Sequence, residues 1–278
     1  MGDSAANVRI GVIGCAGRMG RTNLQEILGT AGAELAGGVE RSEHRAVGQD
    51  LGVLIGQEPI GLSVGDDVEA LIGCSQVVVE FSTPEATLAN AERCARLSCA
   101  HVIGTTGLDP AQARRLRECA AAVPIVWAPN MSVGVNLLLG LVEEVARALD
   151  PSFDVEILEM HHRQKVDAPS GTALALGRAA ARGRGVALDD VAVRSRDGIT
   201  GARPVGAIGF SVLRGGDVVG DHRVLFAGAG ERVELAHVAS DRRIYSRGAI
   251  RAALWAAGQP AGLYGMAEVL GLRRASAG

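Results

Sequence analysis

The sequence predicts an α/β protein with two domains, and three observations support this fold class. First, short apolar runs of strand length alternate with helical patterns through the first half of the chain. Second, a glycine-rich turn joins the first of these strands to the first helix. Third, beyond Asp190 the alternation gives way to extended segments separated by short glycine-containing turns. With 278 residues, the chain is long enough for about two domains.

The composition limits the classes of protein to which the chain can belong. Hydrophobic residues make up 47% of the chain and charged residues 21%, so it can bury a sizeable core, and only 3% aromatic residues make that core mainly aliphatic. A formal charge of −3 argues against a protein that holds nucleic acid on a broad basic face. The first apolar run is too short for a signal or membrane segment, so we expect a cytoplasmic protein without a membrane partner.

The five cysteines predict neither a disulfide nor a metal site. They form no CxxC pair, their number is odd, and most of them lie among apolar residues. Buried free thiols in a reducing compartment fit this pattern, and we expect no bound metal. The cysteines are Cys15, Cys74, Cys94, Cys99 and Cys119.

The first strand and helix form the setting in which a glycine motif predicts nucleotide binding. An apolar run over 8–13 is followed by GCAGRMG and then by a helical pattern. In this context Gly14 suits a tight turn, Gly17 the approach of the backbone to a pyrophosphate, and Gly20 the close packing of helix on sheet. Arg18 adds a charge for a phosphate. The pattern favours a Rossmann-like dinucleotide-binding domain over the alternative, a plain turn between strand and helix.

The next predicted strand ends in an acid and a base that bear on the choice of cofactor. Glu40 lies about 20 residues after the glycine run, where a dinucleotide fold places an acid on the ribose hydroxyls. Glu40 suits the free 2′-hydroxyl of NADH, whereas Arg41 suits the 2′-phosphate of NADPH. Together they indicate tolerance of either cofactor, unless they are merely an exposed acid and base at a strand end.

Further strands of the first domain are predicted to end in polar or glycine-rich turns. The runs at 74–81 and 100–103 read as buried strands, and Thr83 and Pro84 open a helix between them. A helix follows at 109–121, and a last strand runs into the turn at 128–131. Because the carboxyl ends of parallel strands meet at one edge of a sheet, we expect these turns to line a ligand crevice there.

The second domain is predicted to span 133–242, with 1–132 and 243–278 forming the first. A long helix from Asn136 leads to a strand at 154–162, and turns at RGGD and AGAGE predict antiparallel hairpins. We therefore expect an α+β substrate-binding and oligomerisation domain with a mixed, largely antiparallel open sheet. A helix after Arg242 carries Ile250, Leu254 and Trp255, which suit packing back onto the first domain.

One segment, EMHHRQKVDAPSGTA, gathers groups that would serve a functional site. His161, His162 and Lys165 lie within five residues, and Ser170 has the character of a helix N-cap. The helix that it opens would offer the backbone amides of Gly171 and Thr172 to a carboxylate or phosphate. Each residue alone is typical of a strand end or a solvated loop; together they predict a site that combines an anion, a proton donor and an ammonium.

Several motifs resemble those of the dihydrodipicolinate reductase family, in full 4-hydroxy-tetrahydrodipicolinate reductase, of diaminopimelate and lysine biosynthesis. EMHHRQKVDAPSGTA, GCAGRMG, VIGTTG and APNMSVGVN stand in the family's order and spacing, and SRDGITG at 195–201 and GFSVLRGGDVVGDH at 209–222 extend the match. The resemblance covers essentially the whole chain. Its first motif is highly specific, whereas the glycine run alone would be a weak signal.

The resemblance implies a reaction and residues that carry it out. Hydride would pass from NADH or NADPH to the unsaturated ring of a small cyclic dicarboxylate, giving tetrahydrodipicolinate, in a homotetramer built through the second domain's sheet. His161 resembles the family's proton donor and Lys165 a second donor and charge partner. The residues that resemble substrate-carboxylate binders are His162, Gly171 and Thr172.

The same resemblance assigns the cofactor to residues that follow the strands of the first domain. Ala16 stands where the family often has glycine, and Pro129 where some members have alanine; neither change removes a needed side chain. The implied cofactor-binding residues are Gly14, Cys15, Ala16, Gly17, Arg18, Met19, Glu40, Arg41, Gly104, Thr105, Thr106, Ala128, Pro129, Asn130 and Met131.

Two other functions fit parts of the pattern. An amino-acid dehydrogenase would share the fold and change the substrate, but the PSGT anion turn beside HHRQK argues against it. A nonenzymatic nicotinamide sensor would not need His161 or Lys165, and no DNA-binding segment is apparent.

Overall fold

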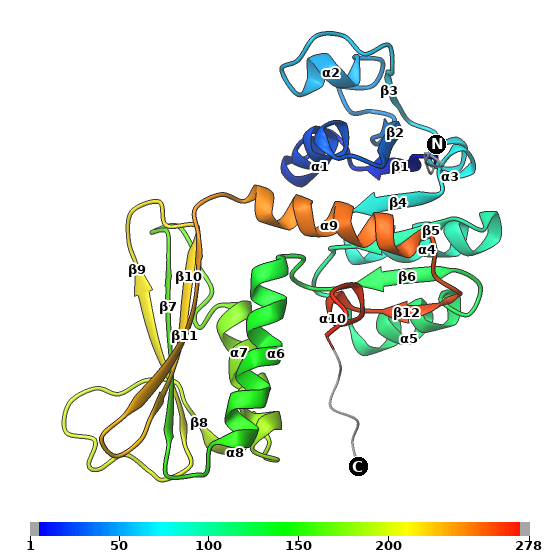
Figure 1. Ribbon diagram of the computed structural model, residues 1–278. Coiled ribbons are helices and arrows are strands. Elements are labelled where there is room, and N and C mark those ends of the chain that lie inside the picture. The colour runs from blue at the N-terminus through cyan, green and yellow to red at the C-terminus, as the bar shows by residue number, and fades with distance from the viewer. Residues whose placement is uncertain (1–5, 273–278) are drawn as a thin grey trace, which may run out of the picture. The chain divides into compact units, whose positions relative to one another are not determined.

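A computed structural model describes residues 6–272 of the chain (Figure 1). The described residues divide into two compact units. Unit 1 contains those up to Val133 together with those from Arg243 onward, and unit 2 is Gly134–Arg242. Within the described chain, no helix is both long and apolar enough to cross a membrane.

Unit 1 is built on a seven-stranded sheet in the order β12-β6-β5-β4-β1-β2-β3, in which every pairing is parallel. The order reverses at β1, which pairs with both β2 and β4, and such a reversal is where open α/β sheets bind ligands. The strands are β1 (Val8–Ile13), β2 (Ala33–Val39), β3 (Val64–Gly65), β4 (Val77–Glu80), β5 (Ala100–Ile103), β6 (Pro124–Trp127) and β12 (Gly262–Tyr264).

Helices bury both faces of this sheet. On β4, Val77 and Val79 pack in the cluster that contains Ile250, whereas Val78 packs with Ile72 on the other face. This explains why the strands read as unbroken apolar runs rather than as alternating ones. The helices are α1 (Arg18–Gly29), α2 (Leu51–Leu54), α3 (Val68–Cys74), α4 (Pro84–Leu97), α5 (Pro110–Cys119), α9 (Arg243–Ala256) and α10 (Met266–Val269).

A local signal sets the start of α4 as predicted. The Thr83 side chain caps α4 by accepting from the Ala86 N–H, and Pro84 occupies the first turn. The predicted packing of Ile250, Leu254 and Trp255 of α9 into unit 1 is confirmed.

Four of the cysteines are buried free thiols, but Cys74 is exposed, because it ends α3 at the surface.

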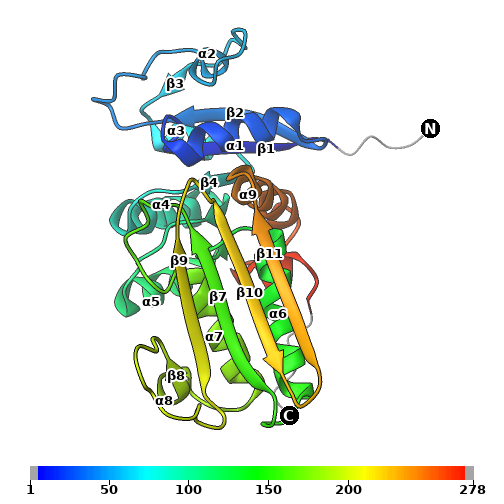
Figure 2. The ribbon, with the colours of Figure 1, turned by 90° about the vertical axis from the view of Figure 1, so that its left-hand side faces the viewer.

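Unit 2 is an open five-stranded sheet in the order β11-β10-β7-β9-β8, with α6 and α7 along one face (Figure 2). Their buried leucines and alanines pack on Val155, Ile157, Val224 and Phe226. The elements are α6 (Val133–Ala148), β7 (Asp154–His161), α7 (Gly171–Gly183), α8 (Leu188–Val191), β8 (Ala192–Val193), β9 (Ile208–Arg214), β10 (Gly220–Ala227) and β11 (Arg232–Ala239).

The sheet of unit 2 is mixed, as predicted, but one predicted hairpin is wrong. The turn at AGAGE joins the antiparallel pair β10 and β11. The turn at RGGD does not join paired strands, because β7 lies between β9 and β10 and is parallel to β9 and antiparallel to β10. The segment 215–219 spans the ~10 Å across one intervening strand. Two of the four pairings are thus parallel.

Candidate functional site

The glycine turn after β1 has the geometry that its sequence predicts. Gly14 has φ of 72°, in the left-handed region that favours glycine, and its carbonyl accepts from the Gly17 N–H at 3.1 Å. A Cβ at Gly20 would lie 2.1 Å from the Gly14 carbonyl oxygen. Only glycine therefore lets α1 start this close to the turn.

The residues around this turn suit a dinucleotide. Gly17 is the N-cap of α1 and makes no side-chain cap hydrogen bond, so no side chain from the cap covers the first amides of the helix. Glu40 reaches the turn from the end of β2, where its Oε1 accepts from the Ala16 N–H at 2.9 Å. Cys15 is buried, and this burial together with nearby Glu40 raises the pKa of its thiol to about 12. Cys15 can therefore offer a ligand only its backbone.

The other predicted cofactor segments follow β5 and β6 at the same edge of the sheet. A Cβ at Gly104 would lie 2.1 Å from the Phe81 ring, so this position also requires glycine. Thr105 is buried, and its hydroxyl oxygen accepts from the Ser82 N–H and the Thr87 hydroxyl. Met131 is only 1% exposed and packs in the core. These buried side chains hold the loops in place, whereas Arg18, Arg41, Thr106 and Pro129 are exposed.

In unit 2, the inward face of β7 changes character along its length. Val155, Ile157, Glu159 and His161 alternate with more exposed residues and are all buried. The first two belong to the hydrophobic core, and the last two are ionisable. The strand therefore carries a carboxylate and an imidazole side by side at its carboxyl end.

Glu159 is the centre of the hydrogen bonds at this end. Its Oε2 lies 2.5 Å from Nδ1 of His161, its two oxygens accept from the two terminal nitrogens of Arg214 at 2.9 and 3.0 Å, and Oε1 accepts from the Ser170 N–H at 3.0 Å. Burial by itself would raise the pKa of Glu159, but these hydrogen bonds outweigh it and hold the pKa below its usual range. Glu159 is therefore a carboxylate.

His161 is held so that its two nitrogens differ. Nδ1 faces Glu159, and Nε2 faces the backbone of β10, where a Cβ at Gly220 would lie 3.0 Å from it. Burial lowers the pKa of His161, and the bond and charge of Glu159 offset only part of that effect. The ring of His222 stands edge-on to His161 at 5.0 Å.

The loop after β7 carries the remaining predicted substrate residues. Lys165 forms an ion pair with Asp167 at 2.7 Å, so its charge already has a partner. His162 Nε2 lies 3.3 Å from a guanidinium nitrogen of Arg242, while its Nδ1 is buried without a partner among the described residues. The peptide between 168 and 169 is cis.

The N-terminus of α7 is formed as the sequence predicts. The Ser170 side chain caps the helix by accepting from the Ala173 N–H at 3.1 Å. Gly171 and Thr172 follow as the first two helical residues. Since Ser170 also donates its own N–H to Glu159, the start of α7 and His161 are fixed to the same carboxylate.

The site also contains Glu159, Arg214 and His222, to which the sequence pattern assigned no role. Arg214 and His222 come from β9 and β10, and nothing local in the sequence pairs them with β7. A signal existed for Glu159, because it shares the buried period-two face of β7 with His161. The charges at the site are balanced, because Glu159 pairs with Arg214 and Asp167 pairs with Lys165.

His222 should make unit 2 sensitive to acid. Burial lowers its pKa to about 4 from 6.5, so between these pH values the unfolded chain binds a proton that the native chain does not. The contribution of neutral His222 to stability is fully present above pH 6.5 and is lost as the pH falls toward 4. Between pH 7 and pH 5 the free energy of unfolding, measured with urea, should fall for the wild-type protein by about 2 kcal/mol more than for His222→Gln. Equal losses would contradict this assignment.

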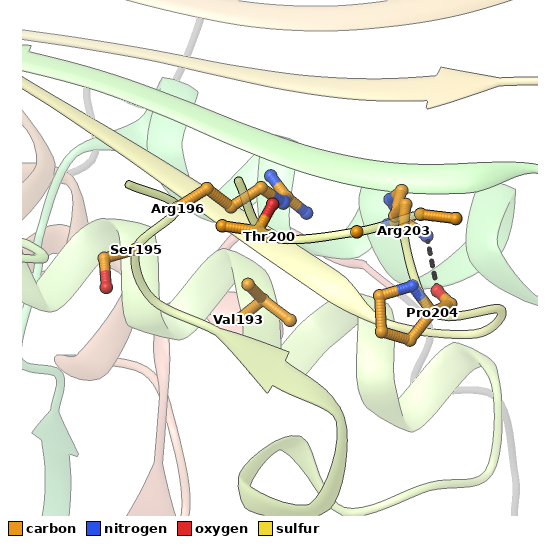
Figure 3. Close-up of a pocket in the computed structure, with 8 residues that line it drawn as sticks. Val193, Ser195, Arg196, Thr200, Arg203 and Pro204 are labelled. Carbon is orange, nitrogen blue, oxygen red and sulfur yellow. Dashed lines mark hydrogen bonds between the residues drawn. The ribbon is translucent and has the colours of Figure 1, made fainter. Parts of the chain in front are cut away.

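A pocket of about 240 Å³ lies elsewhere in unit 2, in the segment 193–204 (Figure 3). Arg196 and Arg203 line it, but both bind Glu156 on β7, and Arg203 also binds Asp154 at 2.6 Å. These carboxylates neutralise the arginines. Because Glu156 lies on the other face of β7 from His161 and about 16 Å along the strand, the pocket is separate from the His161 site.

A parallel Rossmann-like sheet with an open glycine turn, together with a buried carboxylate–imidazole pair, is characteristic of a nicotinamide-dependent oxidoreductase. Residues 8–131 match the family model "Dihydrodipicolinate reductase, N-terminus", and residues 134–270 match "Dihydrodipicolinate reductase, C-terminus". The chain belongs to the dihydrodipicolinate reductase family, as its motifs indicated.

Individual relatives support the same conclusion. The 4-hydroxy-tetrahydrodipicolinate reductase of Methylocella silvestris is 54% identical over 98% of both chains, and that of Ruegeria sp. is 53% identical over 94% of this chain and 97% of its own. Among solved structures, a dipicolinate-bound dihydrodipicolinate reductase from Paenisporosarcina sp. TG-14 has a TM-score of 0.75 at 24% identity, over 94% of this chain and 98% of its own. The last similarity supports the fold.

Proposed function

We propose that the chain catalyses the NAD(P)H-dependent reduction of 4-hydroxy-tetrahydrodipicolinate to tetrahydrodipicolinate in diaminopimelate and lysine biosynthesis. The near full-length similarity to reductases of this name supports the reaction. The buried Glu159–His161 pair is the observation on which the chemistry rests, because it supplies a positioned proton donor.

In this proposal unit 1 binds the cofactor. The amides at the start of α1 take the pyrophosphate, Glu40 and Arg41 lie at the ribose end, and the segments after β5 and β6 hold the nicotinamide and its ribose. The bound cofactor supplies a hydride to the substrate ring. The turn geometry at Gly14 and Gly20 and the Glu40 hydrogen bond to the turn support this assignment.

Unit 2 binds the dicarboxylate and handles the proton. We assign the carboxylates to His162, Lys165 and the amides of Gly171 and Thr172, with Lys165 leaving Asp167 for the substrate. Because the substrate carries a hydroxyl that the product lacks, this hydroxyl leaves as water and gives the unsaturated ring that accepts the hydride. His161 Nε2 then gives a proton to the ring carbon next to the one that accepts the hydride. The free His161 is mostly neutral near pH 7, and a dianion beside it favours its protonated form. Substrate binding would therefore favour protonation of His161, which is the form that can donate.

We also propose a cytoplasmic homotetramer assembled through the sheet of unit 2. Leu213 on β9 and Val238 on β11 belong to this sheet and are 47% and 69% exposed. Apolar side chains of this size are stabilised by cover from a second copy. Light scattering on the purified chain tests the assembly.

The direct test of the reaction is steady-state oxidation of NADH and of NADPH with freshly generated 4-hydroxy-tetrahydrodipicolinate. We expect both cofactors to be oxidised in a substrate-dependent way. Oxidation of neither would contradict the proposed function.

Arg41→Ala is expected to raise the KM for NADPH about tenfold and to change that for NADH less than twofold. Arg41 is exposed and can pair with a 2′-phosphate, whereas NADH lacks this group. Arg45→Ala is the matched control, since it removes a nearby exposed arginine. Equal changes for the two cofactors would show that Arg41 does not distinguish them.

A further inference from the structure

The carboxylate of Glu159 is unusual among the acids of unit 2 because it is 1% exposed and joins three segments. It contacts His161 on its own strand, Arg214 on β9 and the Ser170 amide that begins α7. Arg214 also donates to the Asp167 carbonyl and so ties down the loop that carries Lys165. One side chain therefore connects the groups to which the proposed function assigns proton transfer and carboxylate binding.

We propose that Glu159 is the positioning residue of the proton donor: it fixes His161 in the Nδ1–H tautomer and holds the imidazole in register with the N-terminus of α7. This inference rests on the proposed function, in which His161 is the donor. Glu159 itself does not touch the substrate and acts through His161.

The hydrogen-bond geometry determines the tautomer. Glu159 is ionised and can only accept, so the His161 nitrogen 2.5 Å from it must carry a hydrogen. Neutral His161 then has a lone pair on Nε2, which can take up a proton and pass it on. Gly220 leaves space at this nitrogen, because any Cβ there would lie 3.0 Å away.

Arg214 and Ser170 keep Glu159 in the state that this role needs. Four hydrogen bonds surround the carboxylate, two from Arg214 and one each from Ser170 and His161. A protonated Glu159 would lose the bidentate pair, and a buried carboxylate without Arg214 would be costly. Arg214 therefore acts on His161 through Glu159 and also directly, as a positive charge.

The charges around His161 predict opposite effects of two substitutions. The groups that face it are Glu159 on β7, Lys165 on the following loop, Arg214 on β9 and His222 on β10. The negative charge of Glu159 raises the pKa of His161, whereas Lys165 and Arg214 lower it. Removing Glu159's charge should thus lower the pKa of His161, and removing Arg214's should raise it.

The first experiment measures the tautomer by nitrogen NMR of the His161 ring in the full-length chain, which requires no turnover. In E159Q the amide NH₂ should replace Oε2, because only an Arg214 nitrogen and the adaptable His161 ring face that position, whereas both Arg214 and the Ser170 N–H donate to Oε1. The NH₂ would then donate to Nδ1. We expect neutral His161 to change from the Nδ1–H to the Nε2–H form. E159D, which keeps the charge, should retain the original form.

The second experiment measures kcat against pH. Since the protonated donor is the active form, kcat falls as the pH rises through the pKa of His161. We expect E159Q to lower kcat by about 10- to 100-fold and to shift the fall of kcat to lower pH. We expect R214Q to shift this fall to higher pH. The KM for cofactor should stay within about twofold. E156Q is the matched control, because Glu156 on the same strand also binds two arginines but faces away from His161.

The outcomes separate this inference from the proposed function. The positioning role would be overturned if E159Q kept the Nδ1–H tautomer of His161. It would also be overturned if kcat fell in E159Q and R214Q but its pH dependence stayed unshifted in both. If E159Q does not fold, R214Q still tests the direction in which the pH profile of kcat shifts, and E159D still tests the tautomer of His161. If the wild-type protein shows the Nδ1–H form of His161 but no turnover, the proposed function is contradicted, while the geometry around Glu159 remains supported.

Discussion

Replacing His161 by Ala is expected to lower kcat by about a hundredfold or more, while NADH and NADPH still bind with unchanged affinity. The loss follows because His222, the imidazole that stands edge-on to His161, cannot take its place. His222 is 5% exposed, bonds to Ser170 through Nε2, and has its pKa lowered to about 4, so it resists protonation. Single-turnover kinetics separates the chemical step from cofactor binding, which fluorescence of the reduced nicotinamide reports.

His237→Ala provides the control for removing an imidazole from this sheet. It lies on β11 opposite His222 and has no assigned role, so we expect kcat within about twofold of the unchanged chain. Unchanged turnover in the His161 variant would remove His161 as donor and with it the role of Glu159.

Gly20→Ala is expected to weaken cofactor binding strongly, although it adds only one methyl group. The new Cβ would lie 2.1 Å from the Gly14 carbonyl oxygen and 2.7 Å from backbone atoms of Cys15. Backbone cannot move aside as a flexible side chain can, so α1 must shift from the turn whose amides face the pyrophosphate. We expect a stability loss of about 1–3 kcal/mol and at least a tenfold weaker binding of both cofactors.

The same helix contains a matched control. A Cβ at Gly29, the last residue of α1, would have nothing within 4 Å. Gly29→Ala should therefore leave cofactor binding unchanged and stabilise the chain by up to about 1 kcal/mol through helix propensity. Thermal unfolding and cofactor titration of the two variants test this contrast, and similar behaviour of both would show that the close approach at Gly20 is not required.

Local chemistry made much of the fold predictable. The glycine turn after β1, the Thr83 cap of α4 and the Ser170 cap of α7 depend on neighbouring residues, and all three formed as expected. The unbroken apolar runs also indicated a parallel sheet covered on both faces. These features need no knowledge of distant parts of the chain.

Features that depend on distant residues were missed. The RGGD turn looked like a hairpin because strands adjacent in sequence usually pair, but β7 separates β9 from β10. Glu159 and Arg214 are 55 positions apart, and only the parallel pairing of β7 with β9 brings them together. The family resemblance pointed to His161 and Lys165 but gave no indication of the network behind them.

The central place of β7 has a consequence for how active molecules arise. Its two edges pair with different strands, and each edge brings one member of the cluster, Arg214 from β9 and His222 from β10. A slip of a single residue along either edge would turn that side chain to the opposite face. The same slip would also turn that strand's core residues, Phe210 on β9 or Phe226 on β10, out of the hydrophobic core. A single register therefore sets both the packing of unit 2 and the assembly of its charged cluster.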